Sequence, residues 1–149
     1  MTRRLIDLSM EVYKGMMTYP NVAKPVIIEM ESHSEMARSV GTDQYGVDEI
    51  TNHCMIVTGD HIGTHIDSWG HVKPDAPRAE GIPIDYCYGD GVVLDLTHKR
   101  AGEEITPYHL ENLCNLHEIP APYHSFIVSV LPVKWRGASA APVRAVAII

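Results

Sequence analysis

The chain has 149 residues, of which 45% are hydrophobic, so one compact domain, residues 1–149, can bury a core. Its formal net charge is −7 and its lysines and arginines form no cluster, which argues against a nucleic-acid partner. Arg3 and Arg4 are followed by no apolar run of signal-peptide or membrane-spanning length, so we expect a soluble, cytoplasmic protein without a membrane partner.

The first half of the chain predicts strands separated by one long polar excursion. Residues 3–9, RRLIDLS, and 24–30, KPVIIEM, carry apolar runs that are typical of buried strands. Residues 31–49 are polar, punctuated by glycine and without clean periodicity, so we expect a surface loop there. An apolar strand over 54–57 then leads directly into a histidine-rich stretch, residues 59–71.

The second half of the chain predicts more β structure and one short helix. The β segments are residues 89–97, 126–130 and 143–149, the last two on either side of a Gly-Ala-Ser-Ala turn. The helical candidate is 106–116, with a threonine as N-cap and a proline at the first helical position. Because neither a Rossmann nor a P-loop glycine signature is present, the predicted fold class is a β-rich α/β domain.

The histidine-rich stretch, GDHIGTHIDSWGH, carries three histidines and two aspartates within thirteen positions. A straight helix would turn Asp67 and His71 roughly 80° to 160° away from the two preceding histidines. A straight strand would put all four on one face but, at about 3.3 Å per residue, would separate His61 from Asp67 by roughly 20 Å. Metal ligands lie about 2 Å from their ion, so the chain must bend between His61 and His65. Gly63 is placed to allow that bend.

Two imidazoles and a carboxylate form a borderline ligand set that suits Zn²⁺, Mn²⁺ or Fe²⁺. Three protein ligands leave a position for water or substrate, which is typical of a catalytic site rather than a structural one. His71 is interpreted as a fourth ligand or as a free base, since neutral imidazole suits proton transfer. Asp60 is interpreted as a turn residue or as the partner of an imidazole N–H. Trp69 is either an aromatic wall of the substrate pocket or ordinary core packing.

These residues carry a resemblance to a known family. The segment HIGTHIDSWGH resembles the H-x-G-T-H-x-D-x-x-x-H signature of the cyclase family, which includes bacterial kynurenine formamidase and isatin hydrolase. The segments IDLSMEVYKGMMTYP, IDYCYGDGVVLDLTHK, LENLCNLHEIP and LPVKWRGASAAPVRAVAI are similar to the family's opening, centre and close. The resemblance implies a swivelling β/β/α domain, usually assembled as a homo-oligomer, a dimer or a tetramer.

The resemblance also implies an activity and roles for particular residues. The activity is that of a metal-dependent hydrolase, in which metal-activated water attacks the carbon–nitrogen bond of an N-formyl aryl amide or a small cyclic amide. By position, His61, His65 and Asp67 would bind Zn²⁺ or Mn²⁺, and His71 would be the catalytic acid and base. Glu111 matches a glutamate that joins a second ion in two-metal members of the family.

The chain departs from the family in length. Members are usually longer by several tens of residues, whereas here EEIT runs almost directly into PYHLENL, so a middle segment that normally supplies a histidine ligand is missing. His98 and His109 are conceivable substitutes, although a surface or core role is the more common one for such residues. The alternative hypothesis is therefore a non-catalytic remnant that binds metal or serves as a scaffold.

Overall fold

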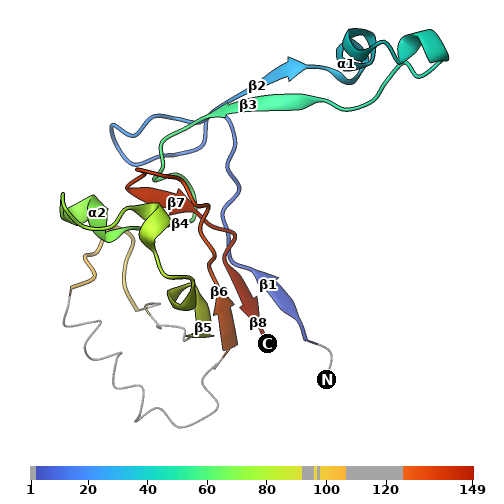
Figure 1. The fold of residues 1–149 in the computed structure, drawn as a ribbon. Helices are drawn as coiled ribbons and strands as arrows, with labels where there is room; N and C mark the ends of the chain where they lie inside the picture. Colours follow the sequence, from blue (N-terminus) through green and yellow to red (C-terminus); the bar gives the residue numbers. More distant parts are fainter. Residues whose placement is uncertain (1–2, 92–95, 97, 107–125) are drawn as a thin grey trace. The chain divides into compact units, whose positions relative to one another are not determined.

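A computed structural model describes residues 3–91, 96, 98–106 and 126–149 (Figure 1). The chain divides into two compact units. Unit 1 comprises Met1–Leu8, Pro83–Leu131 and Arg144–Ile149, and unit 2 comprises Ser9–Ile82 and Pro132–Val143. The single domain expected from composition stays a prediction. Within the described ranges, no helix is both long and apolar enough to cross a membrane.

Unit 1 contains a four-stranded antiparallel sheet in the order β1-β8-β6-β5. Its strands are β1 (Leu5–Asp7), β5 (Tyr88–Gly91), β6 (Phe126–Ser129) and β8 (Val146–Ile148). On β8, Ala147 is paired with Ile6 on one side and with Val128 on the other, and it is buried. The predicted strands at both chain ends and after residue 88 are thus confirmed as strands where they are described, while residues 92–95 and 97 lie outside the described part. The burial expected for residues 3–9 is wrong, because Leu5 on β1 is 67% exposed.

Unit 2 contains two separate two-stranded antiparallel sheets. One pairs β2 (Val26–Glu31) with β3 (His53–Val57), and the other pairs β4 (His65–Asp67) with β7 (Ala140–Pro142). The sequence predicted a turn through residue 140, but Ala140 already belongs to β7 and is fully buried. Its small side chain lets β7 lie against β4, the strand that carries two of the predicted metal ligands.

The prediction that residues 24–30 form a buried strand is correct about the strand and wrong about burial. Val26, Ile27 and Ile28 on β2 are 42%, 38% and 41% exposed. The reason is that β2 pairs only with β3 among the described strands, and β3 is itself exposed along its whole length. Contiguous apolar residues therefore face solvent on this ribbon.

The prediction of a loop over residues 31–49 is also wrong, because helix α1 (His33–Val40) lies within it, beyond the end of β2 (Figure 1). A capping box begins the helix: the backbone N–H of Ser32 donates to the Glu35 carboxylate at 2.8 Å, and the Ser32 hydroxyl accepts from the Glu35 N–H. Gly41 ends it at φ +79°. Ala37 is the buried residue of the helix. A helix that buries so little needs no long apolar face, so its sequence did not suggest a helix.

The remaining helical segments are short. They are α2 (Trp69–Val72) and the 3₁₀ turns η1 (Asp43–Tyr45), η2 (Ala79–Gly81) and η3 (Ile84–Tyr86). The helix predicted over 106–116 falls, apart from its first residue, outside the described residues.

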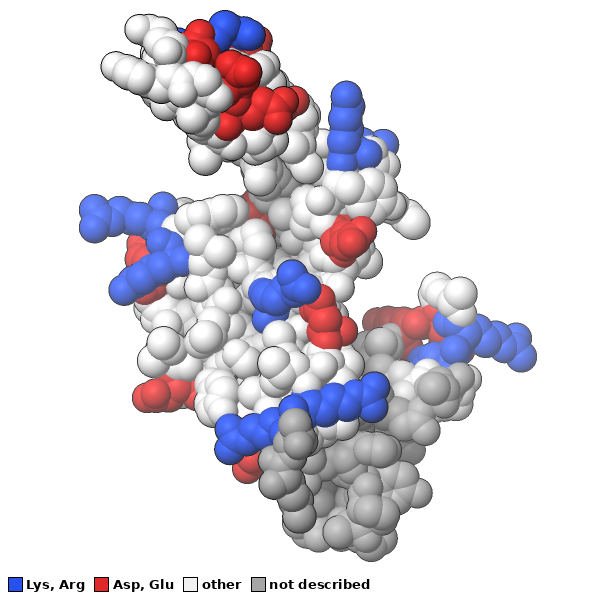
Figure 2. Space-filling model, turned by 90° about the vertical axis from the view of Figure 1, so that its right-hand side faces the viewer, with Lys and Arg blue, Asp and Glu red and all other residues white. Residues whose placement is uncertain are grey.

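Charges of both signs are mixed on the face drawn in Figure 2, where blue and red side chains are interspersed. Two of the cations are paired within unit 1, Lys99 with Glu103 and Arg144 with Asp7. A nucleic-acid-binding surface needs a continuous basic track along the phosphate backbone. The absence of a nucleic-acid partner stays a prediction.

Candidate metal centre

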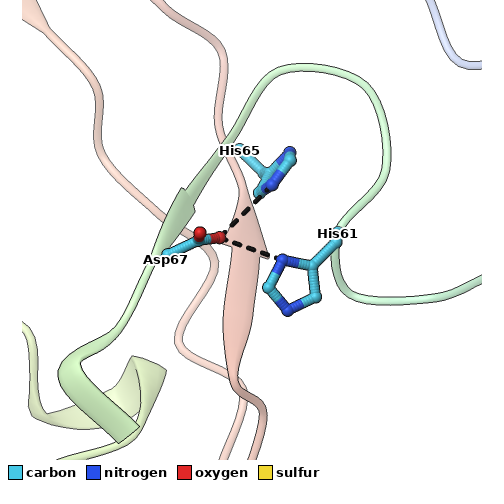
Figure 3. A group of neighbouring side chains, drawn as sticks. All are labelled: His61, His65 and Asp67. Atoms are coloured by element: carbon cyan, nitrogen blue, oxygen red, sulfur yellow. Dashed lines mark ion pairs between the residues drawn. The ribbon is translucent and has the colours of Figure 1, made fainter. Parts of the chain in front are cut away.

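The chain bends at Gly63, between His61 and His65, as a metal site formed by this segment requires. Gly63 adopts φ +56°, the left-handed region that disfavours a side chain. A Cβ at this position would lie 3.0 Å from Cγ2 of Val12, so space is short as well. The bend returns His61 to the side of strand β4, which carries His65 and Asp67 (Figure 3).

Three predicted ligands converge at this bend. His61, His65 and Asp67 each offer one ligand atom, and these atoms lie within 4.8 Å of one another. Oδ1 of Asp67 lies 2.9 Å from Nδ1 of His61 and 3.3 Å from Nε2 of His65 (Figure 3). The imidazoles are 22% and 28% exposed and the carboxylate is 49% exposed, so the group is open to solvent on one side.

The position of the proton on the neutral His65 ring follows from its other partner. Nδ1 of His65 lies 2.9 Å from the carbonyl oxygen of Gly63, which can only accept a hydrogen bond. Nδ1 therefore carries the proton, and the lone pair is on Nε2, which faces Asp67. The same glycine that bends the chain thus also selects the tautomer in which His65 can bind an ion.

The same reasoning applies to His61 through a longer chain of contacts. Nε2 of His61 lies 2.9 Å from Oγ of Ser139, and that hydroxyl lies 2.8 Å from Oδ2 of Asp60. A carboxylate only accepts, so the Ser139 hydroxyl donates to Asp60 and accepts from Nε2–H of His61. The lone pair of neutral His61 is then on Nδ1, which faces Asp67.

Three electron-rich atoms therefore face one point: Nδ1 of His61, Nε2 of His65 and Oδ1 of Asp67. Lone pairs at these distances repel one another unless a cation lies between them. Two imidazole nitrogens and one carboxylate oxygen are the donors that catalytic zinc and manganese sites use. The residues therefore fit a divalent transition-metal ion, with coordination positions left for water or substrate.

Asp60 lies outside this group, in a hydrogen-bond network of its own. Its Oδ2 accepts from the N–H of Ser139 at 2.8 Å, from the Ser139 hydroxyl at 2.8 Å and from the N–H of Ala140 at 3.2 Å. Burial raises the pKa of Asp60, but the hydrogen bonds from Ser139, Ala140 and its own backbone outweigh it and lower the pKa to about 2. Its hydrogen bond to an imidazole is indirect, through Ser139, although Oδ1 of Asp60 also lies 3.9 Å from Nε2 of His61.

His71 lies beside the ligand group on α2. Its ring centroid is 4.3 Å from that of His61, with the two ring planes at 51°. The turn before it is held by Ser68, whose N–H and hydroxyl donate to the carbonyl of Ser139 at 2.9 and 2.7 Å. Gly70 is buried, and a Cβ there would lie 3.0 Å from the carbonyl oxygens of Ala76 and Pro77 and 2.7 Å from Cδ of Arg78. His71 is exposed, and it lies next to His61 on a turn that these hydrogen bonds hold in place.

The other predicted site residues are less constrained. Trp69, also on α2, is 44% exposed, which does not fit core packing. His98 belongs to unit 1 and is exposed. Glu111 and His109 lie outside the described residues, so the second metal site that Glu111 would complete stays a prediction.

Sequence reasoning missed Ser139 and Ser68. Ser139 follows Asp60 by 79 residues, and the sequence suggests only that it belongs to a turn. Ser68 is buried, and its hydroxyl donates to the backbone carbonyl of Ser139. No spacing rule could have paired them, because the pairing of β4 with β7 is what brings them together.

Comparison with known proteins identifies the family and the fold. The family model described as "Putative cyclase" matches residues 6–135. A structure of isatin hydrolase A from Labrenzia aggregata bound to benzyl benzoate is similar, with a TM-score of 0.74 at 14% identity over 99% of this chain and 94% of that chain. A structure described as a potential metal-dependent hydrolase with cyclase activity has a TM-score of 0.64 at 16% identity over 99% and 98%. No curated protein sequence matches the chain.

The structural matches confirm the predicted fold class, a β-rich α/β fold of the cyclase type. The length of 149 residues fits a shortened member. Since the family model covers most of the sequence, from residue 6 to residue 135, the chain belongs to the Cyclase family.

Proposed function

We propose that this chain is a metal-dependent hydrolase that cleaves the carbon–nitrogen bond of a small amide, either an N-formyl aryl amide or a small cyclic amide. The observation that carries the proposal is the convergence of two imidazole lone pairs and the Asp67 carboxylate on one point, open to solvent on one side. Membership of the Cyclase family supports it, as does the likeness to a structure of isatin hydrolase.

In this proposal the protein's own residues hold the reactants and move protons. A divalent ion held by the three ligands supplies Lewis acidity, which lowers the pKa of water and polarises a carbonyl. His71, beside His61 on a fixed turn, accepts a proton from the attacking water and returns it to the leaving nitrogen. Trp69, exposed on the same short helix, offers an aromatic face to the aryl group of the substrate.

The metal part of the proposal is tested by elemental analysis of purified protein. We expect about one equivalent of Zn²⁺ or Mn²⁺ per chain through the three described ligands, and a second only if Glu111 contributes. Asp67→Ala should lose the ion, whereas Asp75→Ala, which removes an exposed carboxylate outside the ligand group, should keep it. Equal metal content in the two variants would contradict the site.

The catalytic part is tested by a substrate screen that begins with isatin and N-formylkynurenine. His71→Ala should keep the ion and lose about 10²- to 10⁴-fold in turnover, the usual contribution of a general acid and base. Parallel loss of metal and turnover would instead make His71 a ligand. Retained metal without turnover on any amide, lactone or formamide would favour the alternative, a non-catalytic remnant.

We also propose that the chain acts as a homo-oligomer, a dimer or a tetramer, in the cytoplasm. The support is the β2–β3 ribbon, on which the cross-strand pairs Val26 with Val57, Ile27 with Ile56 and Ile28 with Met55 are all exposed. Contiguous apolar surface of this kind usually marks an interface. Light scattering that shows a clean monomer at working concentration would contradict the assembly.

A further inference from the structure

Ser139 is held by hydrogen bonds through both its backbone and its side chain, although it is not one of the proposed ligands. Its carbonyl accepts two hydrogen bonds from Ser68, and its N–H donates to Asp60. The next residue begins β7, which is paired with β4. The hydroxyl is therefore held at a fixed place between Asp60 and His61, 2.8 Å from one and 2.9 Å from the other.

The two ring nitrogens of His61 face competing acceptors. On one side, the Asp67 carboxylate lies 2.9 Å from Nδ1 and would accept a proton carried there. On the other side, the oxygen of the Ser139 hydroxyl accepts only from Nε2–H, because its own proton is committed to Asp60. If Nδ1 took the single proton of the neutral ring, the lone pair of Nε2 would meet that of Ser139, and the ligand atom would be blocked.

We propose that Ser139, oriented by Asp60, is a positioning residue that keeps the single proton of His61 on Nε2, so that Nδ1 is free to bind the ion. The inference rests on the proposed metal site, but it makes a statement about the metal-free protein as well. In this inference, Asp60 and Ser139 fix the tautomer of His61 without contacting the ion or the substrate. Partners of this kind usually contribute 10- to 100-fold to metal affinity.

The two residues make separable predictions. Ser139→Ala removes the acceptor for Nε2–H, so the proton should move to Nδ1 and bind the Asp67 carboxylate. Asp60→Ala removes the acceptor that holds the Ser139 hydroxyl proton, so the hydroxyl can turn toward Nε2 and give the same Nδ1–H tautomer. Ser139→Thr keeps the hydroxyl and should restore the wild-type state.

The experiment is ¹⁵N NMR of the imidazole nitrogens in metal-free protein, at alkaline pH where the ring is neutral, combined with a chelator-competition titration with Zn²⁺. We expect Nε2–H in the wild type and in Ser139→Thr, and Nδ1–H in Ser139→Ala and Asp60→Ala, with a 10- to 100-fold loss of Zn²⁺ affinity in the latter two. Ser39→Ala, which removes an exposed hydroxyl on α1, is the control.

The possible outcomes separate this inference from the proposed function. An Nδ1–H tautomer in the wild type, or an unchanged Nε2–H tautomer in Asp60→Ala and Ser139→Ala, would overturn the inference whether or not metal binds. If Ser139→Ala does not fold, Asp60→Ala carries the same test. Failure of wild-type protein to bind Zn²⁺ would count against the metal site, while the tautomer measurement would still decide the role of Ser139.

Discussion

Replacing Gly63 with alanine tests the bend on which the metal centre depends. The residue has φ +56°, and an L-residue in this region costs about 1–2 kcal/mol. The new Cβ would also lie 3.0 Å from Cγ2 of Val12, a contact that this partly exposed side chain can relieve by a small movement. We therefore expect the free energy of unfolding to fall by about 1–2 kcal/mol, most of it from the backbone.

The assay is urea unfolding of metal-free protein, so that backbone strain is measured apart from ion binding. Gly89→Ala is the matched control, because a Cβ at that position meets no atom within 4 Å and its φ is not positive. Adding Val12→Ala to Gly63→Ala isolates the side-chain contact, which should restore only a minor part of the loss.

A consequence for the metal centre follows from the same substitution. The carbonyl of Gly63 accepts from Nδ1 of His65, so a shift of this peptide should also weaken Zn²⁺ binding in a chelator competition. If Gly63→Ala were as stable as Gly89→Ala and bound Zn²⁺ as wild type does, the left-handed turn would not be needed for the site, and our reasoning would be refuted.

Three further predictions concern other parts of the chain. The pKa of Asp60 is lowered from 3.8 to about 2 in the folded state, so the carboxylate contributes about 2 kcal/mol above pH 4–5 that is lost as the pH falls through 2. When the pH is lowered from about 5 to about 2.5, the free energy of unfolding of metal-free wild type, measured with urea, should therefore fall by about 1–2 kcal/mol more than that of Asp60→Asn. Equal losses in the two proteins would contradict this. Ser32→Ala should destabilise α1 by about 1 kcal/mol through loss of its capping box, as seen by faster amide exchange in that helix, whereas Ser39→Ala should not. Iodoacetamide should label exposed Cys54 before buried Cys87, whose thiol pKa is raised by burial, and peptide mass mapping that finds the reverse order would be inconsistent with the described burial.

Much of the metal centre could be predicted from the sequence because its ligands are neighbours along the chain. His61, His65 and Asp67 belong to one short segment, and a glycine between the first two permits the bend. Ligand chemistry and chain geometry are local properties, so they could be weighed without knowledge of any distant residue. The same holds for most strands, whose apolar runs are legible from a few residues each.

Helix α1 was missed although its signals are local. Ser32 and Glu35 form a capping box and Gly41 ends the helix, but the residues between them bury only Ala37. A helix needs a continuous apolar face only where it packs against a core. A short helix beyond the end of a ribbon covers almost nothing, so its caps were the evidence to follow.

What the sequence determined by itself is therefore the proposed ligand set, the bend and the β-rich character of the chain, each of which depends on a few consecutive residues. Tertiary structure alone decided that β2 is exposed, because an apolar run does not reveal whether a covering layer exists. It also decided that Ser139 stands between Asp60 and His61. That contact joins residues 78 and 79 positions apart through the pairing of β4 with β7, and no local pattern encodes which distant strand will pair.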